Sequence, residues 1–168
     1  MGSTVMMLSP WDAPQPLTRA WCLWELFCTV ETGSEFCVCL GSREQAAFEA
    51  SLLDGGAQSL QDAFSKIDVA NAEAGDPEDQ RMILTAVGNL EGGSSRLNAL
   101  VMEQMRTWVL RVIDSMIIQR RVEGGVLIER ELHDVHQLAR TLAAMGENRK
   151  SRDLFEEVVS GLSRTRGA

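Results

Sequence analysis

The chain has 168 residues, 45% hydrophobic side chains and a formal net charge of −8, enough apolar material for one domain, or for one domain and part of a second. The acidic excess excludes the nucleic-acid-binding class, because phosphate binding needs clustered lysine and arginine. No apolar run reaches the roughly 18 residues that a membrane helix needs, and the start lacks the basic segment of a signal peptide. We therefore expect a cytoplasmic protein with no nucleic-acid or membrane partner.

Cysteine usage agrees with a reducing compartment. The chain has four cysteines and no C-x-x-C pair: Cys22, Cys28, Cys37 and Cys39. Without a secretory context we interpret them as reduced thiols. His133 and His136 are the other candidate zinc ligands, and they lie too far along the chain for a usual zinc spacing. We predict no metal site.

The first predicted element is a strand. Val5–Leu8 is a continuous apolar run ended by Ser9 and Pro10, which is typical of a strand buried on both faces of a parallel sheet. The loop from Trp11 to Pro16 follows. Open α/β sheets bind ligands beyond the carboxyl ends of their strands, so this loop and the start of the next helix form the expected site. The alternative is a rigid connector.

Leu17 to Thr32 is predicted to be a helix. Pro14 and Pro16 precede it, and Gly33 stands where a left-handed stop is favoured. Apolar side chains cover most of its surface, so we expect it to be buried on nearly every side. The polar residues share one narrow stripe of the helix: Thr18, Cys22, Glu25 and Thr29. Glu25 is thus a carboxylate on the strip expected to face a cleft or water.

A second buried strand is predicted over Phe36–Leu40, which makes a parallel, right-handed strand–helix–strand unit. Short helices are predicted over residues 46–53 and 60–67, a third begins at Asp76 and Pro77, and the longest runs from Ser94 or Ser95 to about Arg121. The stretch 67–74 is ambiguous between helix and strand.

Gly124 and Gly125 form the best domain boundary. We therefore predict a domain over 1–121, a linker over 122–125 and a helical hairpin over 126–168. Its first helix presents Val135, Leu138, Ala139 and Leu142. Its second helix presents Ser151, Phe155 and Val158.

The tract AWCLWEL, residues 20–26, follows an apolar run and a Ser-Pro loop. In that setting it resembles the middle of a TIR (Toll/interleukin-1 receptor) domain, and the likeness spans residues 5 to 120. The hairpin resembles a single tetratricopeptide unit, as in TIR-like, kinesin-light-chain-like tetratricopeptide proteins. The resemblance implies an α/β, helix-rich fold: a truncated flavodoxin-like parallel sheet of two or three strands, with an edge strand near Ile67–Val69, and a C-terminal α-helical hairpin. A mainly α fold is the alternative.

In TIR enzymes that cleave NAD, the glutamate of this tract is catalytic. By resemblance, Glu25 is the candidate that stabilises positive charge on the ribose as nicotinamide leaves. The candidate ligand or interface residues around it are Ser9, Trp11, Asp12, Trp21, Cys22 and Trp24. Sixteen residues precede Leu17, too few for the first strand, its loop and the next unit of a complete TIR domain.

Three hypotheses follow. The leading one is a non-enzymatic protein–protein interaction or scaffold module in signalling, without a cofactor, whose open sheet edge recruits a protein partner or a second copy of the chain. The second is an NAD-cleaving hydrolase with NAD as substrate and Glu25 as catalytic carboxylate. The third is a gene fragment without independent activity.

Overall fold

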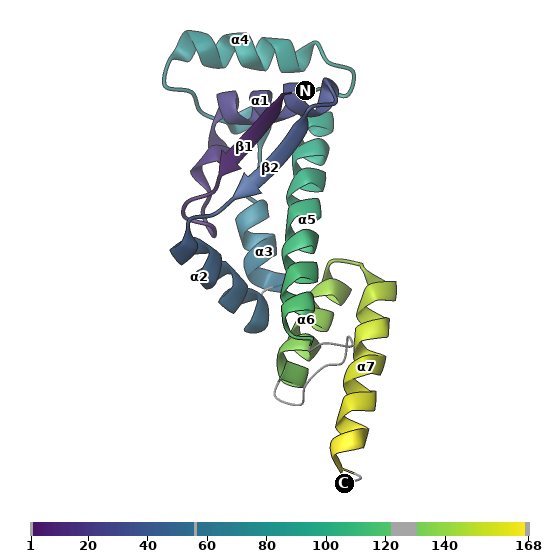
Figure 1. The fold of residues 1–168 in the computed structure, drawn as a ribbon. Helices are drawn as coiled ribbons and strands as arrows, with labels where there is room; N and C mark the ends of the chain where they lie inside the picture. Colours follow the sequence, from purple (N-terminus) through teal and green to yellow (C-terminus); the bar gives the residue numbers. More distant parts are fainter. Residues whose placement is uncertain (1, 56, 122–130, 167–168) are drawn as a thin grey trace. The chain divides into compact units, whose positions relative to one another are not determined.

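The computed structural model of the chain describes residues 2–55, 57–121 and 131–166, with side chains through residue 163. The elements in chain order are β1 Ser3–Met7, η1 Gln15–Thr18, α1 Ala20–Glu31, β2 Glu35–Cys39, α2 Ser42–Leu53, α3 Ala57–Phe64, η2 Val69–Asn71, α4 Pro77–Gly88, α5 Gly93–Gln119, α6 Leu132–Ala144 and α7 Asn148–Arg166 (Figure 1). The fold is helix-rich with a small parallel sheet, which confirms the coarse fold class. The predicted linker at 122–125 lies outside the described residues.

The described chain divides into two compact units. The first comprises Met1–Gln45 and Leu60–Trp108, and the second comprises Ala46–Ser59 and Val109–Ala168. The first unit holds the sheet, α1 and α4, whereas the second holds the α6–α7 hairpin.

The sheet of the first unit consists of β1 and β2, paired in parallel over their full length. The parallel pairing predicted for a strand–helix–strand unit is thus confirmed. Figure 1 shows the two arrows side by side, pointing the same way. On one face Met6 is buried, and α1 contacts both strands. The prediction that the first strand is buried on both faces is wrong, because Val5 and Met7 are 61% and 62% exposed.

The edge strand implied near Ile67–Val69 is absent from the described structure, and a 3-10 turn, η2, stands there instead. Its backbone donors are used by side chains. The carboxylate of Asp68 accepts the Ala70 N–H at 3.0 Å, and the Val69 N–H donates to Asn98 Oδ1 at 3.0 Å. These amides are therefore not available to extend the sheet.

The helix predicted over 17–32 begins at Ala20, because the backbone at Arg19 is extended (φ −103°, ψ 124°). The Ala20 N–H donates to the Glu73 carbonyl at 2.8 Å, and the Glu73 N–H returns a bond to Thr18. The predicted stop is confirmed by Gly33, whose φ of +66° suits a residue without a Cβ. Leu23, Leu26 and Phe27 are among the residues that α1 buries in the core.

Helix α4 begins as its local sequence predicts. Asp76 caps it, its Oδ1 accepting the Glu78 N–H at 2.8 Å, and Pro77 occupies the first turn. The helix has an apolar face, since Ile83 and Val87 are buried and α4 packs against α1.

In the second unit, α6 and α7 form a hairpin with extensive mutual contact. The turn contains Gly146 at φ +81°, a conformation that residues with a Cβ rarely adopt. The residues predicted to line the first helix are all buried: Val135, Leu138, Ala139 and Leu142. Ser151 is buried as well, and its hydroxyl donates to the Ala139 carbonyl at 2.8 Å, so a small polar residue holds the helices close together.

Candidate functional site

Glu25 lies on α1 with its side chain exposed. The polar stripe predicted to include it does not face one environment. Thr29 is only 7% exposed, and its hydroxyl bonds the Thr4 hydroxyl and the Glu25 carbonyl, each at 2.7 Å. Thr29 therefore fastens α1 to β1 and does not share the exposed side of Glu25. Thr29 can be buried because its hydroxyl donates to a backbone carbonyl one turn earlier in its own helix.

The tryptophans predicted around Glu25 are half-buried, each with a different neighbour. Trp21 Nε1 donates to Asp79 Oδ2 of α4 at 3.0 Å. Trp24 stacks on Phe27, with ring centroids 5.4 Å apart. Both side chains pack against the core of the first unit, so the expectation that α1 is an interior helix beside a parallel sheet is confirmed.

The loop after β1 is also held by named contacts. The Trp11 N–H donates to Glu44 Oε2 at 2.8 Å, and Lys66 Nζ donates to the Asp12 carbonyl at 3.1 Å. Ser9 is exposed and precedes a cis peptide bond to Pro10. The candidate loop residues are thus tied to the start of α2 and the segment after α3, whereas Trp21 is tied to α4.

Cys22, the remaining candidate, is a poor nucleophile. Burial raises the pKa of the Cys22 thiol above its ordinary value, Arg19 partly opposes this, and Glu25 adds to it. Burial and Glu25 likewise raise the pKa of Cys28. Both thiols stay protonated at neutral pH, and the thiolate is the reactive form.

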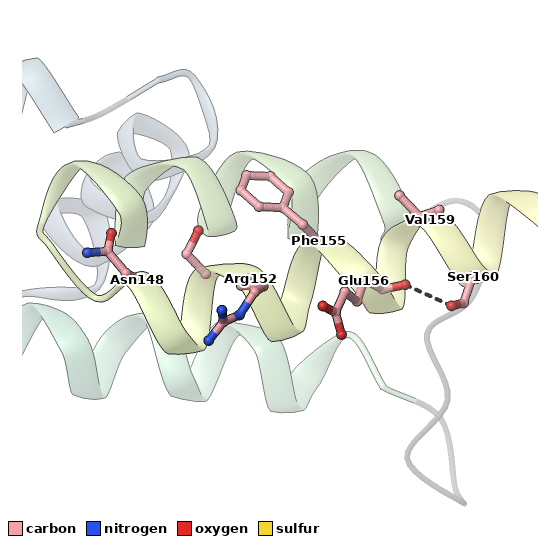
Figure 2. A pocket seen from close by; sticks show the side chains of 7 residues that line it. Asn148, Arg152, Phe155, Glu156, Val159 and Ser160 are labelled. Carbon is pink, nitrogen blue, oxygen red and sulfur yellow. Dashed lines mark hydrogen bonds between the residues drawn. The ribbon is translucent and has the colours of Figure 1, made fainter.

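Open grooves lie on the described surface along α7, between α5 and α7, and along α4. One, of about 560 Å³, runs along α7 between Asn148 and Ser160 (Figure 2). A second, of about 390 Å³, lies between the end of α5 and α7 and carries two ion pairs, Lys150–Asp114 and Arg121–Glu157. The third, of about 550 Å³, follows α4. Glu25 lines none of these three.

The sheet carries a surface that the sequence did not predict. We call the side chains that point away from α1 the outer face of the sheet: Ser3, Val5 and Met7 of β1, and Glu35, Cys37 and Cys39 of β2. In the parallel register Val5 lies beside Cys37 and Met7 beside Cys39. Glu35, at one end, is its one acidic residue, and Cys37 Sγ approaches it at 3.6 Å.

Neither the outer face nor the α7 groove was predicted from the sequence, and for the same reason. In both places the exposed apolar residues are adjacent in the sequence to apolar residues of the core. Val5 and Met7 alternate with Met6 and Leu8 in one apolar run, which conceals the alternation. On α7, buried Leu154 and Val158 are each followed by an apolar residue that points elsewhere, Phe155 and Val159. Adjacent apolar pairs repeated every four residues are the signal of two apolar stripes on one helix.

Comparisons of the chain with protein-family models, with curated proteins and with solved structures gave no match. The TIR-like and tetratricopeptide-like likeness and the catalytic role of Glu25 therefore stay predictions. Within the described ranges, no helix has both the length and the apolar character to cross a membrane.

Proposed function

We propose that the chain is a non-enzymatic protein–protein interaction module that assembles with further copies of itself through the outer face of its sheet. The observation that carries this proposal is the 61% and 62% exposure of Val5 and Met7, neighbours on one face of a parallel sheet. Parallel sheets are almost always covered on both faces. An apolar sheet face in water is thus a surface that a partner stabilises.

The energetics favour coverage of this face. Fully burying a valine or methionine side chain contributes about 1.5–3 kcal/mol, so two copies that cover each other's Val5 and Met7 gain several such contributions. Each described strand also has one unpaired edge, because the sheet contains β1 and β2 alone. Unpaired strand edges are templates for pairing with another chain.

Charge directs where two copies can meet. Each chain carries a net charge of −8, so most pairs of surfaces repel one another. On the outer face, Glu35 at the end of β2 is the one charged side chain, and the rest are neutral. Two copies can therefore approach here with little like-charge repulsion.

The resemblance to TIR-like and tetratricopeptide-like proteins supports a role in a signalling or scaffold assembly. The NAD-cleaving alternative is tested by assaying nicotinamide release by the parent chain and by Glu25→Gln. We expect no release from either. The gene-fragment alternative predicts melting without cooperativity, whereas an independently folded module melts cooperatively.

Sedimentation velocity over a range of concentrations tests the proposal. The parent chain is expected to form larger species as concentration rises, and the double variant Val5→Glu, Met7→Glu should lose this sheet-mediated step. The matched control is Met82→Glu, because Met82 is a 54% exposed methionine in the same unit. It should assemble like the parent. A double variant that assembles as the parent does would overturn the proposal.

A further inference from the structure

Helix α7 carries a second apolar stripe besides the one it buries in the hairpin. Val159 and Leu162 are 62% and 44% exposed, and Phe155 is half-buried against the His136 ring at 5.4 Å. With Asn148 and Arg152 they occupy spacings of four, three, four and three residues. That spacing places all five on one side of the helix, as in the seam of a coiled coil.

Charges flank this stripe on one side. Arg149 and Glu156 are seven residues apart, so they lie on the same side of α7, two turns from each other. Arg152 lies one turn before Glu156, and Figure 2 shows both side chains on the same side of α7. All three are exposed, and none forms an ion pair with another side chain in the part of the chain that the structure describes.

We propose that α7 pairs with α7 of a second copy of this chain, antiparallel, about a twofold axis near Asp153. In an antiparallel helix pair the same flank of each helix meets across the seam. With this centre, Glu156 of each copy lies opposite Arg149 and Arg152 of the other. Phe155 of each copy meets the Arg152 side chain of the other, a contact of cation and aromatic ring.

Charge complementarity selects this register over its neighbours. A shift of the axis by one turn towards the C-terminus places Glu156 against the partner's Glu156. A shift towards the N-terminus brings Arg149 close to the partner's Arg152. A parallel pair sets Arg152, which belongs to the stripe itself, against the partner's Arg152. Like charges at such short range are unfavourable, so the antiparallel arrangement centred near Asp153 alone joins opposite charges on both sides of the axis.

This surface is separate from the outer face of the sheet, since α7 belongs to the second unit and β1 and β2 to the first. The inference does not rest on the proposed function. If both hold, a dimer formed through one contact still presents the other, so copies can join into assemblies larger than dimers.

A charge exchange tests the pairing. Glu156→Arg alone gives a wholly basic flank, and Arg149→Glu with Arg152→Glu gives a wholly acidic flank. For each variant, the dissociation constant of the α7 dimer should be at least about tenfold higher than for the same chain with native α7. An equimolar mixture of the two should restore dimers, because the basic flank then meets the acidic one. Native mass spectrometry identifies these mixed dimers, since the variants differ in mass.

The measurement is made both in the parent chain and in the Val5→Glu, Met7→Glu background, which removes the sheet contact. In that background the chain with native α7 should still dimerise. Glu103→Arg, at an exposed position of α5 in the first unit, is the charge-matched control and should dimerise normally. No dimer in the background with native α7, or no preference for mixed dimers, would overturn the inference while leaving the sheet proposal standing.

Discussion

The β1–α1–β2 region and the α6–α7 hairpin solve the burial problem differently. The hairpin closes its core with residues close in sequence, since each helix buries its stripe against the other and Ser151 bonds Ala139 across the contact. The sheet covers one face with α1 and leaves Val5 and Met7 on the other face open. A helix pair can satisfy its backbone within itself, whereas a strand depends on neighbours along both edges and over both faces.

The difference shows where an interaction surface arises in a small fold. In the hairpin, exposed apolar residues are an addition to a completed core. In the sheet, they are part of an element that lacks half of its usual cover. We therefore expect substitutions on the two faces of β1 to differ greatly in their cost to stability, and the hairpin to respond as an ordinary helical core.

The largest expected effect separates the two faces of one strand. Met6→Glu places a carboxylate at a 7% exposed core position and should lower the free energy of unfolding by about 3–5 kcal/mol or prevent folding. Val5→Glu, one residue away, should change it by less than about 1 kcal/mol. Urea unfolding followed by tryptophan fluorescence makes the comparison. Equal losses would show that the outer face is covered within the chain.

Next comes the core of the hairpin. Leu138→Ala removes a fully buried side chain of α6 and should lower the free energy of unfolding by about 2–5 kcal/mol. His133→Ala, at an exposed position of the same helix, should stay within about 0.5 kcal/mol of the parent. Denaturation followed by circular dichroism measures both. A small loss for Leu138→Ala would mean that this core is not packed as described.

Replacing either of two glycines by alanine should change the free energy of unfolding by a smaller amount, with opposite signs at the two positions. Gly146 has φ +81°, whereas Gly88 in α4 has an ordinary φ, and an added Cβ meets nothing within 4 Å at either position. Gly146→Ala should destabilise by about 1–2 kcal/mol, because the left-handed backbone is strained with a Cβ. Gly88→Ala should stabilise by about 0.5–1 kcal/mol. Melting curves decide the signs, and a stabilising Gly146→Ala would contradict the turn.

The smallest effect concerns pH. Because the pKa of Cys22 is raised in the folded chain, the unfolded chain loses this proton at lower pH than the folded one. Ionisation of the thiol therefore favours the unfolded chain. The free energy of unfolding should fall slightly as pH rises from the ordinary pKa of a cysteine to the raised pKa of Cys22 in the folded chain. Alkylation of Cys22 by iodoacetamide, mapped by peptide mass spectrometry, should be slow at neutral pH and accelerate only in alkaline solution. Fast alkylation at neutral pH would contradict the burial of this side chain.

Local signals were enough to predict most elements. The proline pair, Gly33 and the Asp76 cap each act within a few residues, and the structure has the expected helix ends near them. Arg19 shows the limit, because a bridge to Glu73, far along the chain, sets the start of α1. The strand implied near Val69 is also replaced because of a residue distant in sequence, since the Val69 N–H donates to the Asn98 side chain.

The candidate site was predicted less well. The sequence places Trp21 and Trp24 on an interior helix, as found, but gives no sign that Trp21 bonds Asp79 and Trp11 bonds Glu44. Nor does it show which side of β1 is left open, since an apolar run reads the same with one or both faces covered. These features depend on contacts that no local pattern contains.

Hydrogen exchange at the sheet, measured by mass spectrometry as protein concentration is raised, shows whether a second copy covers the outer face of the sheet. We expect the backbone amides of residues 3–7 and 35–39 to become more protected as copies assemble, and Val5→Glu with Met7→Glu to abolish the change. Exchange at β1 and β2 that stays constant while the chain assembles would contradict the proposal.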